Sequence, residues 1–159
     1  MAPAPSPSSK EGSGVTDRPF SDHEFEQFLG QDKLMGSRCA ACGALFVPPR
    51  SICPRCYGAE MEWAEMKGTG TLTAFTCIAI GPSFMADEGY DRENPYCTGV
   101  VELEEKVRVV ARIEGVDTRN PEGISIGTPV TARFLHRRGD RGDRTFLAFE
   151  PLSRCDRRG

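Results

Sequence analysis

Four cysteines at two matched spacings constrain this chain more than any other feature. Cys39 and Cys42 form one Cys-x-x-Cys pair and Cys53 and Cys56 form a second, with ten residues between the pairs. Two residues between cysteines allow a tight turn to aim both sulfurs at one point, and a second turn completes a tetrahedron. The spacing therefore predicts one structural Zn²⁺ per chain. Because four thiolates leave no open coordination position, such a site cannot activate a water molecule.

Other uses of the four cysteines are two disulfides, an iron site or a catalytic dithiol. Gly43 and Gly58 follow the two pairs and suit a chain that turns sharply around a metal, although Tyr57 makes the second turn less regular. Iron stays open because the same four thiolates suit it. A redox dithiol needs only one pair, in a βαβ context that the sequence does not show. Zinc is the favoured interpretation.

The three remaining cysteines are Cys77, Cys97 and Cys155. We expect each of them to be a small buried or incidental residue rather than a nucleophile. Seven cysteines, four of them assigned to a metal, agree with a reducing compartment. The sequence contains neither a run of 18 apolar residues nor a signal-peptide pattern, so we expect a soluble, cytoplasmic protein with no membrane partner.

Composition divides the chain into five segments. Residues 1–18 are rich in Pro, Ser and Gly and predict a disordered tail. An N-terminal helix segment over 19–33, a zinc ribbon over 34–67 and an OB-fold over 68–152 follow, and 153–159 form a C-terminal tail.

The sequence contains residues that are typical of a helix N-terminus. Ser21 is the predicted N-cap, Glu24 completes a capping box, Phe20 and Phe25 form a hydrophobic staple, and Gly30 ends the helix. Its apolar face consists of Phe25, Phe28 and Leu29. The sequence leaves open whether this face packs on its own chain or on another subunit, since a two-turn helix is not stable alone.

The rest of the chain is mainly β. Strands are predicted over 71–80, 98–103, 107–113, 130–135 and 145–149. Five short strands favour a partly open Greek-key barrel, the OB-fold, over a β-sandwich, which normally has more strands. In the third strand, one face is predicted to be buried: Val107, Val109, Ala111 and Ile113.

Three further features bear on function, and two of them have two interpretations. Trp63 is expected to pack between ribbon and barrel rather than to bind a ligand. The aromatic loop over 81–96 either covers its own barrel mouth or contacts a partner or ligand. The segment 117–127 has strong turn chemistry and is predicted to be structural.

A nucleic-acid role is disfavoured by charge. The formal net charge is −3, whereas proteins that bind phosphate backbones usually carry a positive excess. The one basic stretch, 136–144, alternates Arg with Asp and is expected to be a solvated hairpin loop. The alternative is a single-stranded nucleic-acid binder that uses Arg137, Arg138, Arg141 and Arg144.

No catalytic residue is predicted. The two histidines, His23 and His136, have no nucleophile beside them in the sequence and are expected at the surface. The acidic pair Glu104 and Glu105 is expected in an exposed turn where burial raises no pKa. No residue that binds an organic cofactor is identified.

Short motifs in a fixed order resemble a known family. The order is CAACG (39–43), PPR (48–50), CPRC (53–56), EW (62–63), GTGTL (68–72), NPY (94–96), VVEL (100–103), IGTPV (126–130) and FEP (149–151). Together they resemble the zinc-ribbon OB-fold family associated with acyl-CoA enzymes, over residues 20–152. The chain departs from relatives at the doubled acid of residues 104–106 and at the Arg/Asp-rich loop, but it keeps all four cysteines.

The resemblance implies an N-terminal helix, a rubredoxin-like ribbon, a C-terminal OB barrel and a non-catalytic accessory role. Members accompany thiolases, sterol side-chain aldolases, hydratases and archaeal acetoacetyl-CoA machinery, and one branch is similar to the small subunit of benzylsuccinyl-CoA thiolase. The implied partner is a thiolase-like catalytic subunit in a hetero-oligomer, with acyl-CoA at or near the interface. The alternative is an accessory subunit of a hydratase or aldolase complex.

Overall fold

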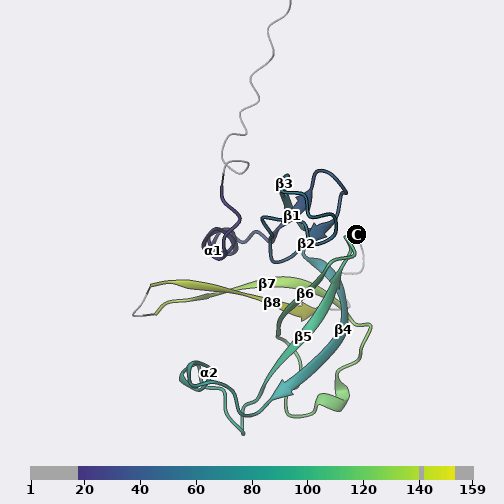
Figure 1. Ribbon diagram of the computed structural model, residues 1–159. Coiled ribbons are helices and arrows are strands. Elements are labelled where there is room, and N and C mark those ends of the chain that lie inside the picture. The colour runs from purple at the N-terminus through teal and green to yellow at the C-terminus, as the bar shows by residue number, and fades with distance from the viewer. Residues whose placement is uncertain (1–17, 140–141, 153–159) are drawn as a thin grey trace, which may run out of the picture.

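The computed structural model describes residues 18–139 and 142–152 (Figure 1). Its elements, in chain order, are α1 (Asp22–Gly30), β1 (Met35–Cys39), β2 (Leu45–Phe46), β3 (Met61–Glu65), β4 (Thr69–Ile78), α2 (Ser83–Asp87), β5 (Tyr96–Leu103), β6 (Arg108–Ile113), the 3₁₀ turn η1 (Pro121–Gly123), β7 (Pro129–Arg137) and β8 (Arg144–Pro151). The predicted tails over 1–17 and 153–159, and Cys155 with them, lie outside the described residues.

Helix α1 begins as its sequence predicts. The side chain of Ser21 accepts a hydrogen bond from the backbone N–H of Glu24 at 3.2 Å. The second half of the predicted capping box is not observed, because the amide of Ser21 donates to the carbonyl of Pro19 at 3.0 Å and the carboxylate of Glu24 pairs with Arg18 at 3.2 Å. Phe28 and Leu29 are buried, which answers the open question about the apolar face: it packs on its own chain, against the barrel and the ribbon.

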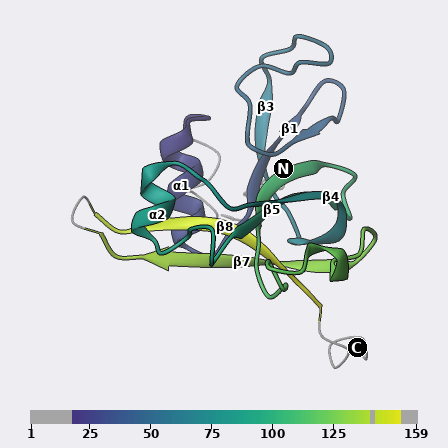
Figure 2. The ribbon, with the colours of Figure 1, turned by 90° about the horizontal axis from the view of Figure 1, so that it is seen from below.

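The ribbon is a small antiparallel sheet in the order β2-β1-β3. It projects from one side of the barrel, as Figure 2 shows. Gly68, at a φ of +76°, turns the chain from β3 into β4. A glycine suits this position because a side chain in the left-handed region is strained.

The five remaining strands close into a barrel in the order β4-β5-β6-β8-β7. The predicted five-stranded OB-fold is confirmed, but the barrel is closed rather than partly open. Strands β4 and β7 pair over Thr69–Thr71, and β6 runs parallel to β8, so every strand has two neighbours. The alternation predicted for this strand is confirmed, because Val109, Ala111 and Ile113 of β6 are buried, as is Val107 directly before it.

Trp63 lies at the junction of the ribbon with the N-terminal segment. Its ring stacks on Phe20 at a centroid distance of 4.7 Å and contacts Phe28 at 4.9 Å. Its indole N–H donates to the backbone carbonyl of Arg18 at 3.0 Å. The structural role predicted for Trp63 is therefore observed, although its aromatic partners belong to α1 and the preceding segment rather than to the barrel.

The loop between β4 and β5 contains a helix, α2, that the sequence did not predict. Met85 from α2 is 4% exposed. The guanidinium of Arg112, on β6, donates to Glu88 at 3.2 Å and to the hydroxyl of Tyr90 at 3.1 Å. The loop therefore folds over its own barrel, while Phe84 keeps 58% of its surface exposed.

Cys77 and Cys97 are bonded to each other, so the prediction that each is an incidental residue is wrong for this pair. They face each other on β4 and β5 and form a disulfide. Cys97 is buried as expected, but its sulfur has a covalent partner. Only the strand register brings the two together, since 20 residues separate them in sequence.

Candidate metal centre and other sites

The structure brings the four predicted cysteines together. Their sulfurs all lie within 4.8 Å of one another. Cys39 Sγ is 3.5 Å from Cys56 Sγ, and Cys42 Sγ is 3.6 Å from Cys53 Sγ. Cys39 ends β1, while Cys53 and Cys56 lie in the loop between β2 and β3. Among the described residues, this is the one group of His, Cys, Asp or Glu side chains with metal-site geometry.

Two tight turns aim these sulfurs. The amide of Gly43 donates to the carbonyl of Cys39 at 2.8 Å, and the amide of Tyr57 donates to the carbonyl of Cys53 at 2.8 Å. Gly43 has the predicted positive φ, 71°. In the second turn Tyr57, not Gly58, takes the left-handed conformation, with a φ of 61°. Glycine instead allows a close approach at Gly58, where an added Cβ would lie 3.4 Å from Cys56 Sγ.

The thiols of the cluster cannot ionise independently. Burial raises the pKa of Cys53, but hydrogen bonds from the amides of Cys56 and Arg55 and from neighbouring thiols outweigh burial and lower the pKa to about 6. The amide of Gly58 lowers the pKa of Cys56, but the adjacent sulfurs and burial raise it to about 12. Crowded thiolates repel one another unless a cation lies between them.

The donor set fits a tetrahedral thiophilic ion. With Zn–S bonds of about 2.3 Å, the edge of a sulfur tetrahedron is about 3.8 Å. The 3.5 and 3.6 Å separations are close to that edge. Two sulfurs, those of Cys39 and Cys53, belong to residues that are 1% and 0% exposed. The geometry therefore suits a structural ion, and zinc and iron share this donor preference.

A second cluster was missed because its members are far apart in sequence. His136 Nε2 lies 2.8 Å from Asp32 Oδ1, and His136 Nδ1 lies 2.9 Å from Thr145 Oγ1. The order resembles an acid–base–nucleophile row, although Thr145 is nine residues from His136 and forms no sequence motif with it. The side chains of His136 and Asp32 are 55% and 63% exposed, however, and such a row needs a desolvated oxyanion site to be effective. These hydrogen bonds connect the residue after α1, Asp32, to the β7–β8 hairpin.

The acidic turn after β5 joins ribbon and barrel. Glu104 accepts from Lys67 at 2.9 Å and from Thr69 at 2.9 Å, and these hydrogen bonds lower its pKa. Glu105 Oε1 accepts from the amide of Lys67 at 2.9 Å, while its Oε2 is buried without a hydrogen bond. Glu105 is thus less exposed than predicted, but its contacts are structural.

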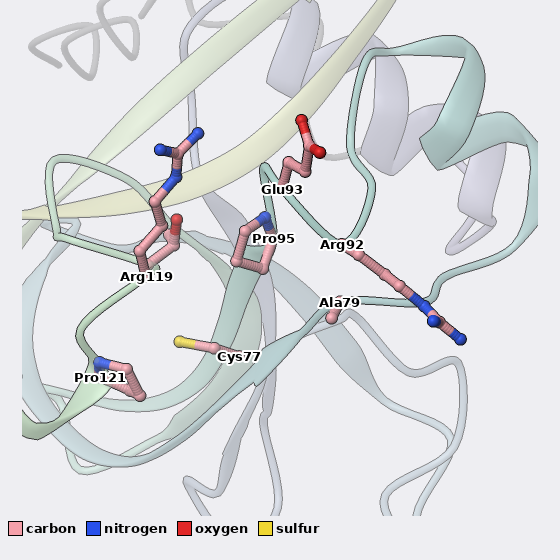
Figure 3. A pocket seen from close by; sticks show the side chains of 8 residues that line it. Cys77, Ala79, Arg92, Glu93, Pro95, Arg119 and Pro121 are labelled. Carbon is pink, nitrogen blue, oxygen red and sulfur yellow. The ribbon is translucent and has the colours of Figure 1, made fainter.

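The described surface has several hollows. One hollow measures 610 Å³ and lies beside Cys77, between the end of the α2 loop and the segment that carries Arg119 (Figure 3). A mostly apolar hollow of 300 Å³ and a mixed hollow of 440 Å³ meet at Val110, which is 69% exposed. The lining of the mixed hollow includes Asp22, Glu26 and Arg144. Within the described ranges, none of the helices is long and apolar enough to cross a membrane.

A four-cysteine ribbon joined to a closed OB barrel defines the class of zinc-ribbon OB-fold proteins. The sequence matches "ChsH2, rubredoxin-like zinc ribbon domain" over residues 27–62 and "ChsH2, C-terminal OB-fold domain" over residues 63–135. A DUF35 domain-containing scaffold protein of Methanocaldococcus jannaschii is 32% identical over 123 residues, which cover 75% of this chain and 82% of the relative. The chain belongs to this ChsH2/DUF35 family.

Two further relatives carry functional names. Benzoylsuccinyl-CoA thiolase subunit BbsA of Thauera aromatica is 37% identical over 82 residues, which span 52% of each chain. A solved Ltp2-ChsH2(DUF35) aldolase chain superposes with a TM-score of 0.65 at 28% identity, covering 84% of this chain and 98% of that one. The family resemblance is confirmed. The benzylsuccinyl branch is not, because the thiolase subunit similar to this chain is named for benzoylsuccinyl-CoA.

Proposed function

We propose that this chain is a non-catalytic accessory subunit of a thiolase-like acyl-CoA enzyme. It docks on the catalytic partner and helps to position or enclose a bulky acyl-CoA, while the partner supplies the residues that break a carbon–carbon bond. The observation that carries the proposal is membership of a family whose relatives include a thiolase subunit and a chain of an aldolase assembly. The proposal includes the bulky character of the acyl group, and an aromatic acyl group is one form of it.

The metal centre has a structural part in this proposal. Cys39, Cys42, Cys53 and Cys56 hold one Zn²⁺, which cross-links the two turns of the ribbon when bound. Four sulfur ligands complete a tetrahedron and leave no position for substrate or water. The ribbon, proposed as residues 34–67, then presents a fixed surface beside the barrel, proposed as residues 68–152.

The described side chains support the non-catalytic role. The one acid–base–nucleophile row, at Asp32, His136 and Thr145, is exposed to water. The acidic pair after β5 is used in contacts with Lys67 and Thr69. Neither place combines a desolvated base with oxyanion donors, which acyl chemistry requires. The partner therefore provides the nucleophile and the base.

An apolar strip on the barrel supports docking. Val110 lies on the outer face of β6, between an apolar hollow lined by Ala74 and Val100 and a hollow in which Phe25 and Phe146 lie beside charged side chains. Exposed apolar surface of this kind is typical of protein interfaces. We place the complex in the cytoplasm, where a reducing environment keeps the ribbon cysteines free to bind the metal. The Cys77–Cys97 disulfide departs from this pattern of reduced cysteines.

The test is reconstitution with the native partner. The tagged chain is purified from its own cells, the copurified protein is identified, and acyl-CoA cleavage is assayed with each protein alone and with both. We expect a thiolase-fold protein at fixed stoichiometry, cleavage by the pair and none by this chain alone. A copurified hydratase indicates the alternative accessory role, and cleavage by this chain alone contradicts the proposal.

A matched pair of variants locates the docking face. Val110→Asp places a charge in the apolar strip, whereas Ile126→Asp places one on an equally exposed aliphatic position elsewhere, since the two residues are 69% and 66% exposed. We expect Val110→Asp to weaken the complex by about tenfold or more, the effect of one buried unpaired charge at an interface. Ile126→Asp should bind like the wild type. Salt-dependent binding of an oligonucleotide instead of a protein partner supports the nucleic-acid alternative.

A further inference from the structure

The Cys77–Cys97 disulfide lies at the base of the loop that carries α2. The two residues are directly opposite in the β4–β5 register and close the intervening segment across the ends of both strands. The loop itself is held independently, because Met85 is buried and Arg112 donates to Glu88. The disulfide can therefore open without releasing the loop.

The two sulfurs have different surroundings. Cys97 is 0% exposed. Cys77 is half-buried and lines the 610 Å³ hollow. In Figure 3 the sulfur of Cys77 points toward the segment that carries Arg119 and Pro121, and Pro95 lies across the hollow from that segment. A small molecule that enters this hollow can reach the sulfur of Cys77 but not that of Cys97.

The hollow is wide enough for a small thiol and carries a positive bias. Its charged lining residues are Arg92, Glu93 and Arg119, two cations and one anion. Low-molecular-weight thiols with carboxylate or phosphate groups are therefore attracted to it more than cationic thiols are. Disulfides that are accessible to solvent are the ones that exchange, whereas buried ones resist attack.

From these observations we propose that Cys77 is a thiol–disulfide exchange site for small anionic thiols, with Cys97 as its buried partner. This proposal does not depend on the proposed accessory function. It adds a covalent modification site at the α2 end of strands β4 and β5, and its chemistry needs only the incoming thiol.

The exchange step balances without any other reactant. The thiolate of the small thiol attacks Cys77 Sγ in line with the existing bond, and a new S–S bond joins that sulfur to Cys77. The Cys77–Cys97 bond breaks, and its electron pair leaves with Cys97 Sγ, which takes up the proton that the thiol lost. Attack by the Cys97 thiolate on Cys77 reverses the step and releases the thiol.

The first test uses the full, zinc-loaded chain with Cys155→Ser to remove a competing thiol. The oxidised protein is incubated in a buffer of reduced and oxidised glutathione, quenched in acid at intervals, alkylated and mapped by mass spectrometry. We expect glutathione on Cys77 and the alkyl label on Cys97. The proposal is overturned if the disulfide-linked peptide persists, if glutathione appears only on Cys97, or if both cysteines are alkylated without an adduct on Cys77 at any time.

The second test compares single thiols. Cys97→Ala leaves the thiol at the hollow, and Cys77→Ala leaves the buried one; each is treated with oxidised glutathione, which is anionic, and with cystamine, which is cationic. We expect Cys97→Ala to react at least about tenfold faster with oxidised glutathione, because reactivity follows access. Equal rates, or a faster Cys77→Ala, overturn the proposal even if the disulfide itself is labile.

The charge preference has its own control. Adding Arg119→Ala to Cys97→Ala should lower the rate ratio of oxidised glutathione to cystamine by about two- to fivefold at low ionic strength, since a cation in the lining of the hollow is lost. Adding Arg108→Ala, at the end of β6 opposite to the residue that pairs with Cys97 and with its side chain 69% exposed, should leave the ratio unchanged. An unchanged ratio with Arg119→Ala refutes the preference for anionic thiols.

Discussion

Replacement of Arg112 tests whether one side chain fastens the α2 loop to the barrel. The side chain of Arg112 is only 10% exposed, and both terminal nitrogens lie 3.2 Å from Glu88 Oε2. One of these nitrogens also donates to the hydroxyl of Tyr90, whose ring lies 5.0 Å from the guanidinium carbon. Arg112→Met keeps an unbranched, apolar stem at this position but removes the guanidinium and with it every one of these polar contacts.

The burial of Arg112 and Glu88 determines how much unfolding free energy the substitution should remove. Removing one partner of a fully buried ion pair costs about 3–5 kcal/mol, whereas exposed pairs contribute about 0–1 kcal/mol. Glu88 is 21% exposed and Arg112 10%, so we expect Arg112→Met to lower the free energy of unfolding by about 2–3 kcal/mol. Glu88→Gln should cost about 1 kcal/mol, and the double variant should show a coupling energy of about 1–2 kcal/mol.

The assay is urea denaturation of the wild type, both single variants and the double variant. Hydrogen exchange of the α2 amides provides a local readout, because loss of the clamp should open this loop before the barrel. Arg108→Met is the matched control: Arg108 also pairs with a glutamate, Glu102 at 3.4 Å, but its side chain is 69% exposed. If Arg112→Met costs no more than Arg108→Met, or if the two substitutions at the clamp are additive, the reasoning is refuted.

Two further predictions concern the junctions of the ribbon. Phe28→Ala should lower the free energy of unfolding by about 3–4 kcal/mol, because Phe28 is 2% exposed and packs on Trp63. The control is Phe84→Ala: because Phe84 is 58% exposed, this substitution should lower the free energy of unfolding by less than about 1 kcal/mol in the same denaturation experiment. The Lys67–Glu104 pair should stabilise the protein above the ordinary glutamate pKa of 4.5 and lose this contribution as pH falls through the lowered folded pKa. Urea titrations across acidic pH should therefore show the difference between wild type and Glu104→Gln shrinking as pH falls, and a difference that grows contradicts the assignment.

Local chemistry made much of the architecture predictable. The cysteine cluster follows from two turns of fixed spacing, and the N-cap at Ser21 follows from one hydroxyl and one amide three residues apart. The barrel strands follow from alternation, although β7 extends to Arg137 and β8 to Pro151, because the hairpin pairs beyond the apolar part of each strand. Patterns of this kind depend on residues that are close in sequence.

The features that sequence did not predict depend on register and long-range packing. Cys77 meets Cys97 only once β4 and β5 are aligned, and Asp32 meets His136 only once α1 lies on the hairpin. Helix α2 is five residues long, too short to form a period, and it is held by Arg112 from a different strand. The one sequence feature that could have indicated this contact is Arg112 itself, an arginine on the outward face of β6.

The central claim is that four sulfurs saturate one metal ion that holds the ribbon together. X-ray absorption spectroscopy of the purified chain, with metal content measured on the same sample, tests this claim most directly. We expect one zinc per chain, a single shell of four sulfurs at about 2.3 Å and loss of the ribbon fold when a chelator removes the ion. A shell that includes oxygen or nitrogen, or a metal-free chain whose ribbon stays folded, contradicts it.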